Sequence, residues 1–144
     1  MYNELRASFL ACNENVALSR CIVVSFLVEL DLEVSVINEL KTVVSEAVTN
    51  AIVHGYLNDK SKMVEFNLKY DNEFIYIEVI DYGVGIADVE KAKEPLFSTK
   101  VDEERAGLGF TIMEVFTDKL CITSNINEGT KILMVKKYHE QGEY

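Results

Sequence analysis

Glu46 and Asn50 are the first side chains in this sequence whose types and spacing could serve a chemical purpose. They are four residues apart in a segment with helical periodicity, so a helix would place both on one surface. Counting 100° per residue, they fall about 160° and 120° from the apolar stripe centred on Val44, outside the packing face. Spacing alone favours a solvated glutamate beside a hydrogen-bonded asparagine, and a ligand site is the alternative.

Asp81 ends segment 74–81, which is predicted as the strand that pairs with 62–70 in a hairpin. Alternation places it on the strand face of Ile75, Ile77 and Val79, so its carboxylate approaches the apolar side of the sheet. An ionised group there is costly unless donors reach it, and a neutral base with an exocyclic amine is one such donor. The alternative is that Asp81 only starts an Asp-Tyr-Gly turn at the strand end.

Four of the seven glycines stand in two pairs. Gly83 and Gly85 permit positive φ or close approach of a ligand to the backbone, although a turn alone explains either. Gly107 and Gly109 are predicted directly before a helix that runs to about residue 118. Free N–H groups and the positive dipole end at that position favour phosphate, but a lone G-x-G is weak evidence.

Charged and hydroxyl side chains lie between and beyond these glycine pairs. Lys100 and Arg105 fall in segment 94–106, predicted as a mobile loop, and a guanidinium there could reach a terminal phosphate when the loop closes. Most loop charges are simply solvated. Thr99 and Thr130 offer hydroxyl donors, although a strand role is the default for Thr130.

Hydrophobic periodicity predicts the elements that must position these residues. Asn13 is the expected side-chain N-cap of the first helix, and Gly55 is the expected stop of the second. The expected order is strand 4–11, helix 14–29, helix 35–54, strand 62–70, strand 74–81, short helix 88–92, loop 94–106, a helix ending near 118, strand 120–125 and strand 130–137.

The first predicted helix carries one arginine of interest, Arg20. It lies away from the apolar positions and is therefore predicted to be exposed. Those apolar positions are Leu18, Ile22, Phe26 and Leu30.

The predicted fold class is α+β, because successive strands join mainly as antiparallel hairpins with helices segregated to one face. We expect a two-layer α/β sandwich with a mixed, mainly antiparallel sheet, in a single domain over residues 1–144.

Composition limits the classes of protein to which the chain can belong. Its 144 residues suit one domain, and 49% hydrophobic with 26% charged residues indicates a globular protein. A formal net charge of −10 argues against nucleic acid or an anionic membrane as partner, whereas a basic protein surface or a nucleotide masked by Mg²⁺ is compatible. Three widely spaced cysteines and the lack of a signal-peptide pattern predict reduced thiols and a cytoplasmic location.

The order of the motifs is more specific than any one of them. E-A-V-T-N at 46–50, D-Y-G-V-G at 81–85 and G-L-G-F at 107–110 follow one another. This arrangement resembles the ATP-binding superfamily shared by DNA gyrase, the large heat-shock chaperone, sensor histidine kinases and mismatch-repair ATPases. The longer runs at 43–56, 95–100 and 107–114 are similar to the sporulation anti-sigma F factors of endospore-forming bacteria.

That resemblance covers nearly the whole chain, and it implies a histidine-kinase-like ATPase fold with ATP between sheet and helices. It also implies a serine kinase that uses Mg²⁺ and ATP to phosphorylate an anti-anti-sigma factor. In its other mode such a protein holds the sigma F factor away from RNA polymerase as a homodimer. ATP and ADP are the implied nucleotides.

The resemblance also implies roles for individual residues. Glu46 becomes the candidate general base, and Asn50 supplies an oxygen to Mg²⁺. Asp81 would accept from the adenine amine, with Thr130 supporting it. Arg20 becomes a candidate sigma contact, and a free surface arginine is the alternative.

The glycines and the segment between them map onto the nucleotide enclosure of the family. Gly83, Gly85, Gly107 and Gly109 correspond to glycines that let the backbone surround the nucleotide. Segment 99–105 corresponds to its lid, in which Thr99 and Lys100 contact the nucleotide and Arg105 reaches the γ-phosphate. The run A-G-L-G at 106–109 lacks the additional glycine common in sensor histidine kinases, so phosphate contacts from that branch do not transfer.

Three other interpretations compete with this one. A histidine-kinase catalytic module needs an acceptor histidine on a dimerisation helix, and only His54 and His139 are present, neither in such a setting. A general-stress anti-sigma kinase would share the same ATP motifs. A nucleotide-dependent binding module without significant kinase activity is opposed by the intact Glu46.

Overall fold

The computed structural model describes the backbone of residues 1–94 and 101–138, with the side chains of all of these except 101–106. A five-stranded sheet with the order β1-β2-β3-β5-β4 forms one layer. Every neighbouring pair in it is antiparallel, so the predicted α+β sandwich is confirmed while the mixed sheet becomes wholly antiparallel in the described part. The strands are β1 (Asn3–Leu10), β2 (Met63–Tyr70), β3 (Phe74–Asp81), β4 (Lys119–Asn125) and β5 (Gly129–Lys137).

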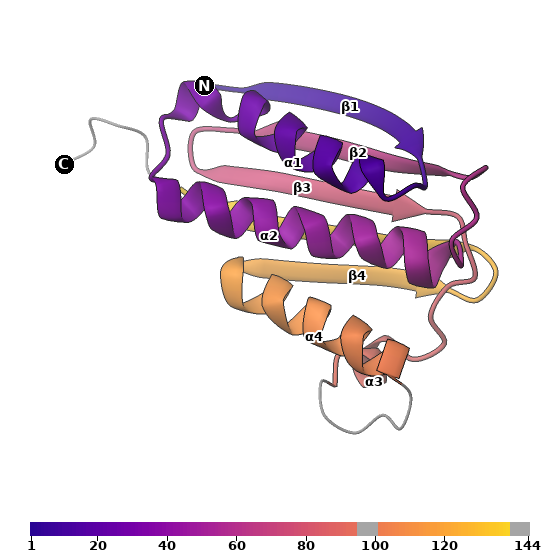
Figure 1. Ribbon diagram of the computed structural model, residues 1–144. Coiled ribbons are helices and arrows are strands. Elements are labelled where there is room, and N and C mark those ends of the chain that lie inside the picture. The colour runs from indigo at the N-terminus through magenta and orange to yellow at the C-terminus, as the bar shows by residue number, and fades with distance from the viewer. Residues whose placement is uncertain (95–100, 139–144) are drawn as a thin grey trace.

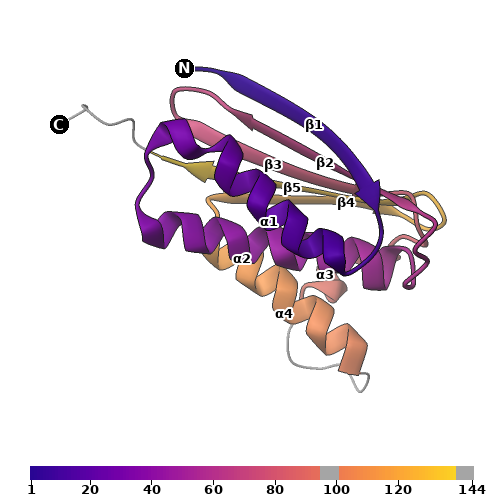
Figure 2. The same ribbon diagram turned by 45° about the horizontal axis from the view of Figure 1, so that its top comes forward.

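Helices form the second layer, and they cover one face of the sheet (Figures 1 and 2). The central helix α2 packs between α1 and α4. A search of the described residues finds no helix long and apolar enough to cross a bilayer. The helical elements are α1 (Glu14–Phe26), the 3₁₀ turn η1 (Val28–Leu30), α2 (Val34–Asn50), the π-helical turn η2 (Ala51–Gly55), α3 (Val89–Ala92) and α4 (Val101–Phe116).

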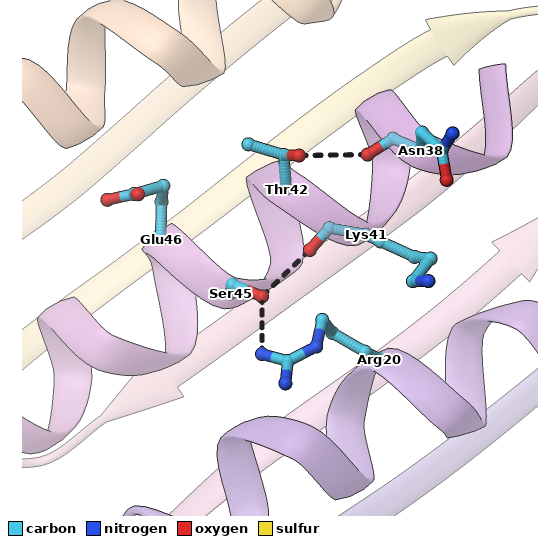
Figure 3. Close-up of a pocket in the computed structure, with 6 residues that line it drawn as sticks. All are labelled: Arg20, Asn38, Lys41, Thr42, Ser45 and Glu46. Atoms are coloured by element: carbon cyan, nitrogen blue, oxygen red, sulfur yellow. Dashed lines mark hydrogen bonds between the residues drawn. The ribbon is translucent and has the colours of Figure 1, made fainter. Parts of the chain in front are cut away.

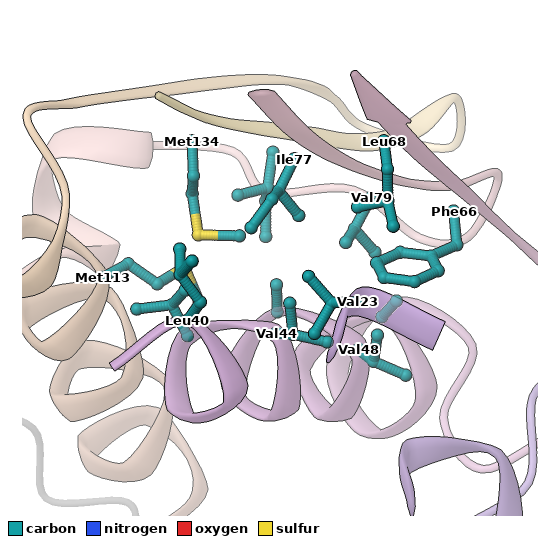
Figure 4. Close-up of a cluster of buried hydrophobic side chains, with 14 of the residues drawn as sticks. Val23, Leu40, Val44, Val48, Phe66, Leu68, Ile77, Val79, Met113 and Met134 are labelled. Atoms are coloured by element: carbon teal, nitrogen blue, oxygen red, sulfur yellow. The ribbon is translucent and has the colours of Figure 1, made fainter. Parts of the chain in front are cut away.

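The core lies between the two layers (Figure 4). Strands β2 and β3 alternate buried and half-buried side chains, because successive residues of a strand point to opposite faces. Each fully buried Val, Leu or Phe contributes roughly 1.5–3 kcal/mol relative to an exposed one. Facing side chains include Leu40, Val44 and Val48 from α2 and Phe66, Leu68, Ile77, Val79 and Met134 from the sheet.

Helix α1 is rotated relative to the sequence prediction. Its buried positions are Ser19 and Val23, whereas Leu18 is 45% exposed. The hydroxyl of Ser19 donates to the Val16 carbonyl at 2.6 Å, so this polar side chain can be buried without losing a hydrogen bond. A search for apolar residues alone does not find such a buried position. Asn13 does precede the helix, but its own backbone is already helical and its side chain makes no cap bond.

Helix α4 begins at Val101, so the second half of the predicted loop 94–106 is helical. Gly107 and Gly109 therefore lie inside the helix rather than before it, and the prediction of a helix N-terminus beside them is wrong. The run Asp-Glu-Glu-Arg-Ala at 102–106 explains the difference, because these residues form helices well and acids favour a helix start. A helical turn made only of polar residues has no apolar repeat, so a search for apolar periodicity does not detect it.

Candidate active site

Asp81 lies at the end of β3 with its carboxylate on the helix-facing side, as alternation predicts. The residue is 4% exposed. The backbone N–H of Gly83 donates to its Oδ1 at 3.0 Å, and the backbone of Thr130 also donates to the carboxylate. Burial nevertheless raises the pKa of Asp81 to about 6. Two donors thus leave this carboxylate incompletely compensated, and a ligand donor would be favoured there.

Gly55 packs directly on the Asp81 carboxylate. A Cβ at Gly55 would stand 2.5 Å from Cγ of Asp81, so no larger side chain fits. Gly55 ends the helical run as predicted, but its φ is not positive, so close approach of Asp81 is what requires a glycine here. The carbonyl of Gly55 also accepts from the N–H of Val84 at 2.9 Å, which fixes the loop that follows Asp81.

Tyr56 anchors the same loop and was not singled out from the sequence. Its buried hydroxyl accepts from the N–H of Tyr82 at 2.8 Å and donates to the carbonyl of Met63 at 2.6 Å. Burial raises the pKa of the Tyr56 phenol, and the neighbouring Asp81 and Glu65 charges raise it further. The hydrogen bond from the Tyr82 backbone lowers it, but by less than burial raises it. No sequence spacing relates position 56 to position 82, so only the fold reveals the contact.

A row of polar residues crosses three strands at Asp81. Thr130 on β5 pairs with Asp81, and Ser124 on β4 pairs with Thr130. Residues directly opposite on antiparallel strands share a face, so all three lie toward the helices. Thr130 is thereby beside Asp81, where the sequence predicted it, whereas Ser124 was missed. The sequence predicted the hairpin and its Asn-Glu-Gly turn, and pairing residues outward from that turn would have placed Ser124 opposite Thr130.

Gly85 closes this end of the site. Its φ is +75°, and a Cβ there would stand 2.0 Å from the Asn125 carbonyl oxygen. The positive φ expected for this glycine is therefore present, and the group packed against it is the protein's own backbone.

Glu46 faces α4 from the middle of α2. A Cβ at Gly109 would stand 2.9 Å from Oε2 of Glu46, so this glycine lets α4 pack against the carboxylate. Burial raises the pKa of Glu46. Glu46 is thus half-buried at the edge of an open groove, and a carboxylate with a raised pKa is a stronger proton acceptor once ionised.

Asn50 is buried, contrary to its position on the helical wheel. A wheel describes one helix and cannot include the elements packed beside it. Within the described residues, the side-chain Nδ2 of Asn50 is buried without a hydrogen-bond partner. Such a group costs roughly 1–3 kcal/mol, which a ligand that pairs with the amide would recover.

Arg20 reaches across from α1 to α2 instead of extending into solvent (Figure 3). Its guanidinium donates to Oγ of Ser45 at 2.9 Å, and that hydroxyl donates to the carbonyl of Lys41. The prediction of an exposed Arg20 is therefore wrong, because the side chain is half-buried between two helices. It lines an open groove of about 410 Å³ together with Asn38, Lys41, Thr42, Ser45 and Glu46.

The structure describes the remaining predicted site residues only in part. Thr99 and Lys100 lie outside the described residues. Arg105 belongs to the first turns of α4, but its side chain is not among those described. Gly107 is buried within α4. The described site therefore comprises Glu46 and Asn50 on α2, Gly55 at the end of η2, and the cluster around Asp81.

Two solved structures share the fold. The RsbU and RsbW domains of Rv1364c from Mycobacterium tuberculosis match 93% of this chain with a TM-score of 0.61 and 20% identity, over 32% of that longer chain. The SiaB–SiaC complex from Pseudomonas aeruginosa matches 93% of this chain and 89% of its own, with a TM-score of 0.57 and 8% identity. At these identities the likeness concerns the fold alone.

Sequence relatives are much closer. The chain is 45% identical to the anti-sigma F factor of Geobacillus stearothermophilus over 98% of this chain and 97% of that protein. It is 47% identical to that of Clostridium perfringens SM101, over 95% and 98%. Residues 9–136 match the family described as the histidine kinase-like ATPase domain. The chain thus belongs to the histidine-kinase-like ATPase family and, within it, to the anti-sigma F factors.

Proposed function

We propose that this chain is an ATP-dependent protein serine kinase that also sequesters a sigma factor. Its substrate is a serine of an anti-anti-sigma protein, and its sequestered partner is the sporulation sigma F factor. The observation that carries the proposal is the buried, incompletely compensated Asp81 at one end of a site whose other end holds Glu46. The ATPase family identifies ATP as the ligand. Asp81 would then bind the adenine base, and Glu46 would lie beside the phosphate that is transferred.

The base-binding end is built around Asp81. Its carboxylate accepts a hydrogen bond from the exocyclic amine of adenine. This bond offsets part of the desolvation cost that the two backbone donors leave uncompensated. Thr130 supports the same base from the neighbouring strand. Gly83 and Gly85 keep the loop backbone close enough to enclose the base.

The two ends are joined by the helical segment from α2 into η2. Residues 46 and 55 are nine positions apart, or roughly 13 Å along a helix. An extended nucleoside triphosphate covers such a separation. Asn50 lies between the two ends, and its buried amide nitrogen, which has no partner among the described residues, can donate to a phosphate oxygen.

Magnesium, when bound, would neutralise phosphate charge through hard oxygen ligands, and the Asn50 amide oxygen is a suitable one. Glu46 accepts the proton of the substrate serine hydroxyl. The serine oxygen then bonds to the γ-phosphorus, the bond to the bridging oxygen breaks, and ADP leaves. Arg105, Lys100 and Thr99 are assigned to phosphate contacts and Gly107 to the nucleotide enclosure, while Gly109 of α4 lies beside Glu46.

The sigma-binding mode uses protein surface rather than the nucleotide pocket. We assign Arg20 to a partner contact, because it lines an open groove with Asn38, Lys41 and other polar side chains of α2, and this groove reaches Glu46 at its edge. A homodimer, a single domain over 1–144 and a cytoplasmic location complete the proposal. The net charge of −10 favours protein partners over nucleic acid or anionic membrane.

The deciding experiment incubates the chain with γ-labelled ATP, magnesium and a candidate anti-anti-sigma protein, and measures sigma F binding in parallel. Acid-stable, base-labile phosphate on the second protein is expected, with stoichiometric sigma binding. Acid-labile phosphate on this chain itself would indicate a histidine kinase instead. Sigma binding that depends on nucleotide without any phosphate transfer would indicate a binding module.

A further inference from the structure

Ser124 is the central member of a hydroxyl network at the base-binding end. Its Oγ accepts from the backbone N–H of Ile86 at 2.7 Å. It donates to the carbonyl of Gly129 at 3.0 Å, and it lies 2.8 Å from Oγ1 of Thr130. Ser124 therefore connects the loop after Asp81, the β4–β5 turn and the threonine that pairs with Asp81.

The number of protons in this network determines its direction. A serine hydroxyl has one proton and two lone pairs. The Ser124 proton is used on Gly129, and one lone pair is used by Ile86. The contact with Thr130 is then satisfied only if the threonine hydroxyl donates to Ser124. The opposite direction would take the Ser124 proton away from the Gly129 carbonyl.

This direction fixes what Thr130 can offer to a ligand. With its proton committed to Ser124, the Thr130 oxygen presents lone pairs only. Asp81 beside it also accepts when ionised. The row thus presents two neighbouring acceptors, which suit the amine at position 6 of adenine and repel the carbonyl oxygen at position 6 of hypoxanthine or guanine.

We infer that Ser124 is a specificity-determining residue, which selects a 6-amino over a 6-oxo purine by holding the Thr130 hydroxyl as an acceptor. The inference rests on the proposed nucleotide site. Ser124 acts through Thr130 and is a positioning residue, since it need not touch the base. Without it the threonine hydroxyl rotates and donates to a 6-oxo group.

A purely structural role for Ser124 makes a different prediction. Loss of the Ile86 contact alone would loosen the loop and weaken every nucleotide equally. The ratio of ATP to ITP affinity separates the two roles, because ITP differs from ATP only in carrying hypoxanthine. Loop loosening leaves that ratio unchanged, whereas reorientation of Thr130 lowers it.

The test measures ATP and ITP dissociation constants for the full chain and for Ser124→Ala. We expect the ratio to fall about 5- to 10-fold, through weaker ATP binding and unchanged or tighter ITP binding. Ser124→Thr should restore the ratio to within about twofold of the native value. Exposed Thr123 on the same strand provides the control Thr123→Ala, which should leave both constants unchanged.

A double-mutant cycle tests whether Ser124 changes the ATP-to-ITP affinity ratio through the Thr130 hydroxyl. In a Thr130→Val background, Ser124→Ala should cause no further change in the ratio, because the hydroxyl it orients is absent. If Ser124→Ala fails to fold, Ser124→Cys gives the same measurement with a weaker acceptor for the Thr130 proton and should show a smaller fall. A native ratio in Ser124→Ala, or in Ser124→Cys where the alanine variant does not fold, overturns the inference, and so does equal weakening of both nucleotides. Failure of the native chain to bind ATP would instead overturn the proposed function.

Discussion

Gly83 lies so close to Gly55 that a Cβ at position 83 would stand 1.9 Å from the Gly55 carbonyl oxygen. The obstructing atom is backbone, and the same carbonyl is held by the N–H of Val84. The two glycines therefore bring the segment after α2 and the loop after β3 into direct contact, with the Asp81 carboxylate against both. Residues 55 and 83 are distant in sequence, yet a side chain at 83 would displace backbone and one at 55 would displace the Asp81 carboxylate.

Gly83→Ala should damage both stability and nucleotide binding. The new methyl group must displace backbone, and we expect a loss of about 2–4 kcal/mol in the free energy of unfolding. Chemical denaturation measures this loss, and ATP titration measures binding. Val84→Ala in the same loop, at a 41% exposed position, is the control and should change stability by less than about 0.5 kcal/mol. Native stability in Gly83→Ala would show that the loop can move away without cost.

Asp81 should make the nucleotide-free protein less stable as pH rises. Its folded pKa of about 6 exceeds the unfolded value of 3.8, so the stabilising contribution is complete below pH 3.8 and is lost as pH rises through 6. Relative to Asp81→Asn, the native protein should lose about 2–3 kcal/mol between pH 4 and pH 7.5. The difference between the two unfolding free energies across this range isolates Asp81 from other acids. A difference that is constant with pH would mean an ordinary Asp81 pKa.

Glu46→Gln should separate ATP binding from phosphate transfer. The substitution keeps the size of the side chain and removes its ability to accept a proton, so transfer should fall about 10²- to 10⁴-fold with little change in ATP affinity. Because burial raises the pKa of Glu46, the native rate should also decline as pH falls toward that pKa. Exposed Glu33 provides the control Glu33→Gln. Native transfer rates in Glu46→Gln would remove Glu46 from the role of base.

Asn50→Ala should weaken magnesium-dependent binding selectively. Affinity for ATP with magnesium should fall at least about tenfold, and affinity for metal-free ATP should fall much less, since the proposed contact passes through the metal ion. Calorimetric titrations with and without EDTA make the comparison. An unchanged effect of magnesium on binding would exclude the proposed ligand.

Tyr56→Phe should weaken ATP binding without reaching the nucleotide directly. It removes the acceptor of the partly buried N–H of Tyr82, which costs about 1 kcal/mol and loosens the loop beside Asp81. Tyr76→Phe removes a hydroxyl from the opposite end of β3, where it bonds Asp71, and is the matched control. Loss of ATP affinity only in Tyr56→Phe is expected, as measured by titration alongside thermal unfolding. Equal behaviour of the two variants would contradict the anchoring role.

Much of the fold could be predicted because most elements have strong periodicity. Alternation in β2 and β3 gave the hairpin and the inward direction of Asp81, and the apolar repeat of α2 gave the central helix. Prediction failed where polar residues break the pattern. Ser19 is buried by bonding its own helix, and the polar first turns of α4 show no apolar repeat.

The candidate site was less predictable, because its contacts join elements that are remote in sequence. The proximity of Gly55 to Asp81, the burial of Asn50 and the bond from Arg20 to Ser45 all depend on how helices pack. Motif order pointed to the correct residues but not to their surroundings. Tyr56 and Ser124 act through backbone groups and a second hydroxyl, and no motif includes such partners.

The continuous run from α2 into η2 has a consequence for chain length. Glu46, Asn50 and Gly55 occupy fixed places along one helical rod, and each inserted residue would shift the later positions by about 1.5 Å and rotate them by about 100°. A π-helical turn is itself the kind of feature that one extra residue creates in an α-helix. Insertions and deletions should therefore be excluded between residues 46 and 55, while the connection after Tyr56 remains free to change length.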